Sequence, residues 1–238
     1  MAYKGKKVSV VIPTYNEAGS IRGVIEEFFN TGLVDEIVVV DNNALGKTRE
    51  EIGKTKARLV EERRPGYGFA LMRGLLEAKG ELVVMCEADG TFLPKDIEKL
   101  LSYSDEFEAV LGTRTSRAAI WSGAFMPFPV RFGNWLWAKV IEVLFNGPVL
   151  TDVGCTYKLL SRKALEKIKN LFSLSDGGPK FSPELMIWLI RRKVNIIEIP
   201  VIYKERVGKS GYTGSIWRAT KLGLRMLPLI IKYRFKKI

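Results

Sequence analysis

The sequence predicts an α/β protein built on an open, mostly parallel β-sheet flanked by helices. Short runs of β-branched and other apolar residues alternate along the chain with segments whose apolar residues recur at helical spacing. Several of these runs end directly in polar residues, and open α/β sheets bind ligands beyond the carboxyl ends of their strands. The 238 residues, 47% of them hydrophobic, suffice for one such domain with a small addition.

The first half of the chain supplies the repeating strands and helices. Residues 8–12 form a β-branched run that predicts a strand ended by Pro13. Ser20 then precedes a segment with helical spacing over residues 21–29, which Gly32 ends. The further predicted strands are residues 36–40, 58–61, 82–86 and 109–112, and the further predicted helices are residues 47–56, 69–78 and 94–101.

The predicted strand at residues 82–86 is central because two carboxylates, Glu87 and Asp89, follow it directly. A continuous apolar run bounded by charge is typical of a strand buried on both faces. Glu87 and Asp89 are two residues apart, so at a strand exit both can close on one ion. Carboxylate oxygens suit a hard cation such as Mg²⁺ or Mn²⁺ that carries substrate phosphates. An ordinary acidic turn is the alternative for this pattern taken alone.

Polar residues at other strand ends favour the metal site over an ordinary turn. Residues 13–17, Asp41 and Arg114 each follow a predicted strand, so the fold places them in one crevice with Glu87 and Asp89. No G-x-G-x-x-G follows the first strand, and a glycine pair after the third strand is weak evidence for a dinucleotide site. The absence of G-x-x-x-x-G-K-[ST] excludes a P-loop ATPase.

The composition limits the available chemistry. The chain has no histidine, which excludes His-based zinc sites, Ser-His triads and histidine general bases. Acid–base work would therefore fall to Asp, Glu, Lys or Tyr. Cys86 and Cys155 match no metal or redox spacing, which predicts reduced, buried thiols in a cytosolic protein.

No targeting or membrane-spanning segment is predicted. The basic residues among the first seven are not followed by the apolar region of a signal peptide. No run reaches the about 18 apolar residues of a spanning helix. Residues 118–130 are uncharged but contain Pro127 and Pro129, which predicts a loop or an interfacial segment.

The net charge of +12 is concentrated near the C-terminus. Residues 206–238 hold nine Lys or Arg and no acidic residue, whereas the rest of the chain carries 29 basic and 26 acidic residues. Basic residues at positions 218, 221, 225, 232 and 236 recur at helical spacing beside Trp, Leu and Ile, and Pro228 is expected to kink or split the helix. This pattern predicts a basic amphipathic helix on an anionic membrane surface. A helix packed on the core and a dimer contact are the alternatives.

Taken together, the motifs resemble those of family 2 glycosyltransferases with the GT-A fold, over about residues 8–210. Residues 11–17 (Val-Ile-Pro-Thr-Tyr-Asn-Glu) are similar to the opening motif that lines the nucleotide pocket. Residues 64–70 resemble the glycine-containing segment that starts the third helix, and residues 87–90 occupy the position of the D-x-D metal motif. The resemblance implies a nucleotide-sugar site formed by Pro13, Tyr15, Glu17, Asp41, Gly66, Glu87, Ala88 and Asp89.

Two departures from the family pattern affect this implied site. Asp41 stands where the family places a base-contacting Asp, and Asn42 replaces the usual second Asp. The first acid of the metal motif is Glu87 rather than Asp. Asp89 is therefore expected to be the direct ligand of Mg²⁺ or Mn²⁺, with Glu87 as the second candidate.

Within the family, the nearest resemblance is to polyprenyl-phosphate (dolichol-phosphate) sugar transferases. Residues 152–158 look like the acceptor-side segment, usually closer to D-x-T-S-G-F-R, from which Thr156 and Lys158 partly depart. Residues 199–201 and 206–210 resemble a late strand and a basic loop that closes over phosphates. The phosphate- and acceptor-binding candidates are Arg131, Arg206, Lys209 and Ser210.

The resemblance implies inversion at the anomeric carbon by one in-line displacement, from a UDP- or GDP-sugar to a lipid phosphate. A metal at Asp89 and cations such as Arg114 would stabilise the leaving diphosphate. A hydroxyl acceptor must lose a proton, for which Asp152 is the candidate base. A lipid phosphate, with a second pKa of about 6, is already anionic at neutral pH and needs cations such as Arg131 more than a base. Transfer to a hydroxyl of a lipid-linked or soluble glycan is the alternative.

These inferences predict a glycosyltransferase domain at residues 1–210 and a membrane-associating tail at residues 211–238, at the cytoplasmic face of a membrane. Two other classes fit less well. Sugar nucleotidyltransferases would carry a glycine- and arginine-rich loop after the first strand, where this chain has residues 13–17. A nucleic-acid-binding protein is suggested by the pI of about 9.7, but the nearly balanced body and the apolar tail argue against nucleic acid as a partner.

Overall fold

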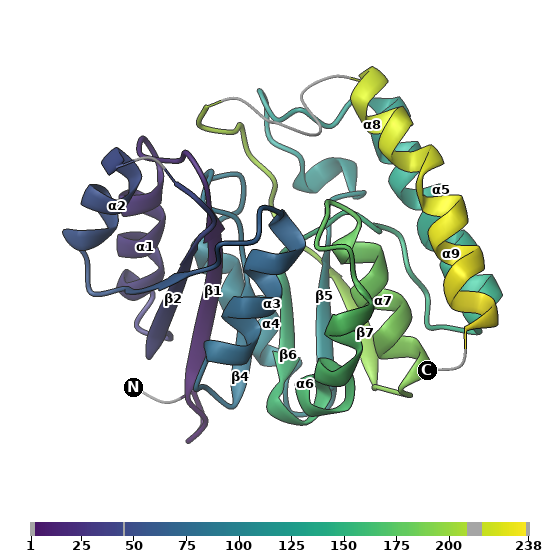
Figure 1. The fold of residues 1–238 in the computed structure, drawn as a ribbon, viewed down its shortest axis with the longest axis horizontal. Coiled ribbons are helices and arrows are strands. Elements are labelled where there is room, and N and C mark those ends of the chain that lie inside the picture. The colour runs from purple at the N-terminus through teal and green to yellow at the C-terminus, as the bar shows by residue number, and fades with distance from the viewer. Residues whose placement is uncertain (1–2, 45, 209–215, 237–238) are drawn as a thin grey trace.

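Seven strands form one sheet, and helices cover both of its faces (Figure 1). The computed structural model describes residues 3–44, 46–208 and 216–236. The strands are β1 (Val8–Thr14), β2 (Glu36–Asp41), β3 (Arg58–Glu61), β4 (Leu82–Met85), β5 (Ala109–Thr113), β6 (Lys158–Ser161) and β7 (Ile196–Pro200). The helices are α1 (Ile21–Asn30), α2 (Gly46–Gly53), α3 (Tyr67–Glu77), α4 (Ile97–Ser102), α5 (Phe128–Phe145), α6 (Arg162–Ile168), α7 (Phe181–Arg191), α8 (Ile216–Leu224) and α9 (Met226–Phe235), with 3₁₀ turns η1 (Pro94–Asp96), η2 (Arg117–Ala119) and η3 (Lys169–Leu174).

The strand order is β3-β2-β1-β4-β6-β5-β7, and the prediction of a mostly parallel sheet is confirmed. Four neighbouring pairs are parallel, whereas β6 is antiparallel to both β4 and β5. Because β6 runs against its neighbours, the segment that leads into it lies at the edge where β4 and β5 end. Residues 152–157 therefore reach the same edge as Glu87 and Arg114.

The prediction that Pro13 ends the first strand was wrong. Strand β1 continues to Thr14, and Pro13 pairs in register with Val40 of β2. Pairing with β4 stops at Val11. The sheet therefore does not need a hydrogen bond from the N–H that Pro13 lacks on that side. The polar turn at residues 15–17 consequently begins farther along the crevice than the sequence suggested.

Alternating strand residues supply two buried layers, one on each face of the sheet. One layer joins residues such as Val11 and Val83 to side chains of α3, α5, α6, α7 and α9 around the fully buried Trp188. The other joins residues such as Val10 and Val84 to side chains of α1, α2 and α4. Cys86 and Cys155 are free thiols in the buried interior, as predicted.

Helices α5, α8 and α9 lie side by side beyond α7, at one end of the molecule (Figure 1). The predicted split of the C-terminal helix is confirmed: α8 ends at Leu224 and α9 begins at Met226, which places Pro228 in the first turn of α9. One side of α9 packs on the core through Met226, Leu229, Ile230 and Tyr233. No helix that the structure describes is both long enough and apolar enough to cross a bilayer.

Some elements differ from the sequence-based predictions. Residues 118–127 are largely loop, as predicted, but α5 already begins at Phe128 because Pro129 is tolerated in a first helical turn. Strand β6 and helices α6 and α7 had not been predicted. The proposed division at residues 210 and 211 falls within a segment outside the described residues, and it stays a prediction.

Candidate active site

The exit of β4 places two carboxylates in the crevice, in different surroundings. Asp89 is buried, and its Oδ1 accepts hydrogen bonds from the amide (3.0 Å) and the hydroxyl (2.6 Å) of Thr91. Asp89 Oδ2 forms an ion pair with Arg206 Nη1 at 2.9 Å, and apart from this ion pair it has no hydrogen-bond partner within the described part of the chain. Gly90, between Asp89 and Thr91, makes the turn at φ +76°, a conformation that favours glycine. The turn thus fixes Asp89 and leaves one oxygen for a cation.

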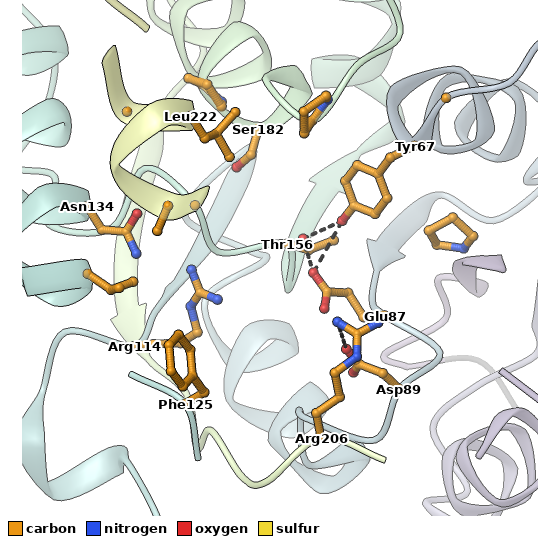
Figure 2. Close-up of a pocket in the computed structure, with 18 of the residues that line it drawn as sticks. Tyr67, Glu87, Asp89, Arg114, Phe125, Asn134, Thr156, Ser182, Arg206 and Leu222 are labelled. Carbon is orange, nitrogen blue, oxygen red and sulfur yellow. Dashed lines mark hydrogen bonds and ion pairs between the residues drawn. The ribbon is translucent and has the colours of Figure 1, made fainter. Parts of the chain in front are cut away.

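Glu87 belongs to a hydrogen-bonded group with Tyr67 and Thr156 (Figure 2). Its Oε1 accepts from Thr156 Oγ1 at 2.8 Å and from Tyr67 OH at 3.4 Å, and the two hydroxyl oxygens lie 2.5 Å apart. Burial, together with the charge of Asp89, raises the pKa of Glu87 to about 7. Tyr67 and Thr156 are site residues that the sequence analysis did not single out. Both stand inside segments that resemble family motifs, which was the available signal.

The turn after β1 is organised by Glu17. Its Oε2 accepts from Thr14 Oγ1 (2.8 Å) and from the amides of Tyr15 (2.7 Å) and Asn16 (2.9 Å). Its Oε1 lies 3.8 Å from Arg206 Nη2. The predicted residues Pro13, Tyr15 and Glu17 therefore line the crevice together with Arg206.

The exit of β2 differs from the implied nucleotide site. The Asp41 carboxylate is buried, accepts from the amide of Ala44 at 2.6 Å and pairs with Arg49, and it does not line the cavity. Asn42 and Asn43 line it instead. The implied contact of Asp41 with the base stays a prediction.

Asn42 also anchors the segment that leads into α3. Its amide donates to the carbonyls of Glu62 (2.8 Å) and Arg64 (2.7 Å), and its Oδ1 accepts from Gly66 N at 2.8 Å. Gly66 lines the cavity, and a Cβ there would come within 2.5 Å of the Gly177 carbonyl oxygen. Only glycine fits this close approach.

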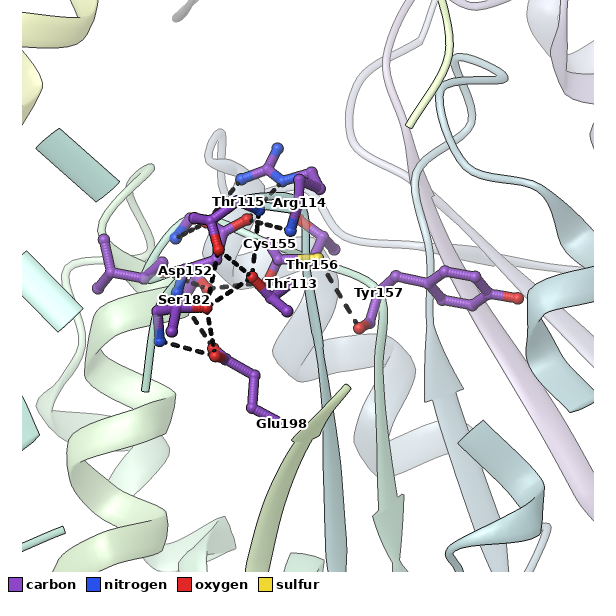
Figure 3. Close-up of polar contacts among 12 residues, drawn as sticks. Thr113, Arg114, Thr115, Asp152, Cys155, Thr156, Tyr157, Ser182 and Glu198 are labelled. Atoms are coloured by element: carbon purple, nitrogen blue, oxygen red, sulfur yellow. Dashed lines mark hydrogen bonds and ion pairs between the residues drawn. The ribbon is translucent and has the colours of Figure 1, made fainter. Parts of the chain in front are cut away.

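A buried ion pair joins the exit of β5 to the segment that leads into β6. Asp152 Oδ2 accepts from the Arg114 amide (2.9 Å) and Nε (2.8 Å), and Oδ1 accepts from Arg114 Nη2 (3.0 Å) and Gly154 N (3.0 Å) (Figure 3). Burial alone would raise the pKa of Asp152, but the charge and hydrogen bonds of Arg114 hold it below its usual range. Both oxygens of Asp152 are occupied in holding Arg114, which is a poor arrangement for a general base.

Glu198 of β7 holds this pair from behind (Figure 3). Its carboxylate accepts from the amide (2.7 Å) and the hydroxyl (2.6 Å) of Thr151 and from the amide of Asp152 (3.1 Å). Arg114 also lies over the ring of Tyr203, with 5.0 Å between its Cζ and the ring centroid. The Arg114 guanidinium is thus held by a carboxylate on one side and by an aromatic ring on another.

We expect Glu198 to give the protein a pH-dependent stability. Burial raises its pKa to about 7, from 4.5, despite the hydrogen bonds donated by Thr151 and Asp152. A raised folded-state pKa contributes stability that is present below about pH 4.5 and is lost as the pH rises through 7. Glu198→Gln, which cannot ionise, should therefore show a smaller fall in the free energy of unfolding between pH 5 and pH 8, measured by urea titration. The control is Glu26→Gln, at an exposed position of α1. Equal falls in the free energy of unfolding of wild type and Glu198→Gln would contradict the prediction.

A cavity of about 1150 Å³ is lined by residues that follow β1, β4 and β5, among them Glu17, Glu87, Asp89 and Arg114. Figure 2 shows Tyr67, Glu87 and Asp89 on one side and Asn134 and Leu222 on the other. The volume of the cavity exceeds the roughly 300–1,000 Å³ of common small-molecule pockets, so the cavity has room for two substrates. We call its two ends the polar arm, lined by Pro13, Glu17, Asn43, Gly66, Asp89 and Arg206, and the apolar arm, lined by Phe125, Met126, Val130, Leu136, Leu222 and Met226.

The predicted acceptor residues are not all placed at the cavity. Arg206 lines it, as does Ala88 of the predicted nucleotide-sugar site, but Arg131 does not: the Arg131 guanidinium lies 5.9 Å from the Phe128 ring centroid. Lys209 and Ser210 lie outside the described residues. Asn134 and Ser182, which the sequence analysis did not identify, also line the cavity.

Behind Ser182 lies a buried lysine. Lys158 Nζ donates to Ser182 Oγ at 2.8 Å, and burial lowers the pKa of the lysine. Ser182 stands in the first turn of α7, so the positive end of that helix and Arg114 line the cavity, with Lys158 behind Ser182. This part of the site is suited to an anion.

Comparisons with known proteins agree with this geometry. Residues 9–169 match the glycosyl transferase family 2 model. A dolichyl-phosphate hexose transferase of Haloferax volcanii is 30% identical over 87% of this chain and 87% of its own length. A low-salt glycan biosynthesis hexosyltransferase of the same organism is 29% identical over 85% of this chain, which spans about half (49%) of that relative.

Among solved structures, glucosyl-3-phosphoglycerate synthase from Mycobacterium tuberculosis, in complex with Mn²⁺, UDP and phosphoglyceric acid, has a TM-score of 0.73 at 19% identity. The match covers 99% of this chain and 81% of that one. The likeness confirms the predicted GT-A fold. The chain belongs to glycosyl transferase family 2 and is a nucleotide-sugar-dependent glycosyltransferase.

Proposed function

We propose that the protein transfers a sugar, with inversion and with the help of Mg²⁺ or Mn²⁺, from a UDP- or GDP-sugar to a polyprenyl phosphate at a membrane surface. The observation that carries the proposal is the single cavity with one polar and one apolar arm. The polar arm offers the groups that a nucleoside diphosphate needs, and the apolar arm continues between α5 and α8. The names of relatives, such as the dolichyl-phosphate hexose transferase, support the same acceptor class.

The metal would be held at Asp89. Apart from its ion pair with Arg206, the buried Oδ2 has no hydrogen-bond partner among the described residues, which fits a carboxylate ligand of a hard cation. No group of three or more His, Cys, Asp or Glu that could hold an ion was found among the described residues, so substrate phosphates would complete the coordination. When bound, the cation supplies charge stabilisation for the leaving diphosphate.

The acceptor would place its phosphate at the middle of the cavity. Arg114 and the first turn of α7, with Lys158 behind it, make this region positive. Asp152 is fully engaged with Arg114, and this favours an acceptor that is already anionic over a hydroxyl that must lose a proton. Arg114 would thus bind and orient the attacking phosphate oxygen.

The test is a transfer assay with labelled UDP- and GDP-sugars, in which the organic-phase product is measured. We expect product with a short-chain polyprenyl phosphate and none with the corresponding polyprenol, and loss of product after chelation of the metal. Product with the polyprenol, or with a glycan hydroxyl, at a rate equal to that with the phosphate would support the alternative acceptor class instead.

We also propose that helices α5, α8 and α9 rest on the membrane. Phe128, Phe132 and Trp135 of α5 form one exposed aromatic row, with neighbouring ring centroids 6.0 and 5.8 Å apart. Exposed apolar residues continue on α8 and α9, beside exposed basic residues, as is typical of interfacial helices. The apolar residues are Ile216, Trp217, Leu224, Leu227, Ile231 and Phe235, and the basic ones are Lys221, Arg225, Lys232 and Lys236.

Substitution of Phe235 by serine should weaken vesicle binding. The Phe235 side chain is 82% exposed, and placing it in a bilayer contributes up to about 2 kcal/mol, or roughly 30-fold in partition coefficient. Flotation with vesicles containing phosphatidylglycerol measures this, and Leu76→Ser on α3 is the control because Leu76 is also exposed. Equal binding by wild type and Phe235→Ser, or no binding by wild type, would contradict the proposal.

A further inference from the structure

The guanidinium of Arg206 occupies the position at which the proposed metal ligand is open. Arg206 Nη1 lies 2.9 Å from Asp89 Oδ2, and its Nη2 lies 3.8 Å from Glu17 Oε1. The other oxygen of Asp89 is taken by Thr91, and the other oxygen of Glu17 by its own turn. Arg206 therefore covers the carboxylate oxygens that the two acids leave open.

The backbone holds Arg206 at this place independently of its charge. The amide of Lys204 donates to the Thr91 carbonyl at 2.8 Å, and the amide of Val207 donates to the Asp89 carbonyl at 2.9 Å. These two hydrogen bonds attach the segment on both sides of Arg206 to the turn that carries Asp89. The backbone therefore fixes the position of this contact in the fold.

A divalent cation and the guanidinium compete for the same oxygen. A metal bound to Asp89 Oδ2 must displace Arg206, and the displaced guanidinium then needs a new anionic partner. A nucleoside diphosphate provides one, because guanidinium groups bind phosphate oxygens through two parallel hydrogen bonds. The polar arm of the cavity, which Arg206 lines, places such a diphosphate within reach.

We infer that Arg206 is the resident cation of the nucleotide-free site and that the site therefore takes up the divalent cation together with a nucleoside diphosphate, not alone. This inference rests on the proposed metal-dependent function and adds the order in which the site fills. Arg206 changes partners, from the carboxylates in the empty site to the diphosphate in the loaded one. Linkage requires the reciprocal effect: the metal and the nucleotide each raise the affinity for the other.

The experiment measures Mn²⁺ binding to the full chain by electron paramagnetic resonance of free Mn²⁺, with and without UDP, GDP or CDP. In wild type we expect weak binding of Mn²⁺ alone, and at least about tenfold tighter binding with one of the nucleotides, within the usual range of coupling. In Arg206→Gln, Mn²⁺ alone should bind several-fold tighter than in wild type, while the nucleotide in the presence of Mn²⁺ should bind more weakly. Substitution of a residue with only a structural role would not raise the affinity for Mn²⁺ alone while lowering the affinity for the nucleotide.

Two further variants make the result decisive. Arg206→Lys keeps the charge and should keep Mn²⁺ alone excluded, which also covers the case of an unstable glutamine variant. Lys204→Gln removes a charge from the same segment and should leave both affinities near those of wild type. If Arg206→Gln binds Mn²⁺ alone no more tightly than wild type does, the inference is wrong although the function stands. If neither protein binds Mn²⁺ with any of the three nucleotides, the metal-dependent function falls, and the inference with it.

Discussion

Asp89→Asn should abolish metal-dependent nucleotide binding and lower sugar transfer by at least about 100-fold, the scale seen when one group that stabilises developing charge is removed. The substitution keeps the side-chain oxygen that accepts from Thr91 and removes the charge of the oxygen that faces Arg206. The measurement is a thermal-shift titration with UDP, GDP and CDP, each with and without Mn²⁺. A ligand at 100 times its Kd stabilises the folded state by about 2.7 kcal/mol, which gives a readable shift.

The control for this substitution is Asp105→Asn. Asp105 is also an acid in an ion pair, with Lys4 and Lys6, and it does not line the cavity. Wild type and Asp105→Asn should show the same Mn²⁺-dependent shift with one nucleotide, and Asp89→Asn should show none. An Asp89→Asn protein that keeps this shift would place the metal elsewhere.

Arg114→Met should destabilise the protein by about 3–5 kcal/mol, because removal of one partner leaves a buried charge without compensation. Asp152 is 1% exposed and receives three of its hydrogen bonds from Arg114. One of these comes from the backbone amide and survives the substitution. Urea unfolding at pH 7 measures the loss. At lower pH the loss should shrink, since protonation removes the uncompensated charge of Asp152.

Two comparisons separate burial from the mere loss of an ion pair. Arg22→Met breaks an exposed ion pair with Glu26 and should change the stability little, because water and salt screen exposed pairs. The double variant Arg114→Met with Asp152→Leu should be more stable than Arg114→Met alone, because the uncompensated carboxylate of Asp152 is removed. If Arg114→Met were no more destabilising than Arg22→Met, the Arg114–Asp152 pair would not be the internal support described above.

Much of the fold was predictable because the first half of the chain is locally consistent. In residues 8–113 the strands other than β3 are short apolar runs, and most helices have either a clear periodic face or a clear end. The second half gives weaker signals. Strand β6 has four residues, one of them the buried Lys158, and α7 carries Pro183 and the buried Glu184. From sequence alone, a lysine predicts a surface position and a proline predicts a loop. Lys158 can be buried because it donates to Ser182, a contact that only the folded chain shows.

The site was predictable where a residue follows a strand, and less so where it depends on a partner. Asp89, Glu17 and Arg114 lie at strand exits, and the fold rule alone brought them together. Asp41 is also at a strand exit, but its carboxylate is bound by Arg49, a contact that no spacing rule contains. Leu136 and Leu222 come from two helices, α5 and α8, that meet only in the folded chain, so the apolar arm of the cavity had no signature in the sequence.

The central claim is that donor nucleotide and lipid phosphate share one cavity, and photoaffinity labelling tests it most directly. The probe is a short polyprenyl phosphate that carries a diazirine near its phosphate end, and mass spectrometry locates the labelled residues. We expect labels on the α5 and α8 residues of the apolar arm, such as Leu136 and Leu222, and protection by unlabelled polyprenyl phosphate but not by the polyprenol. Labels confined to residues outside the cavity, or equal protection by the polyprenol, would contradict the account.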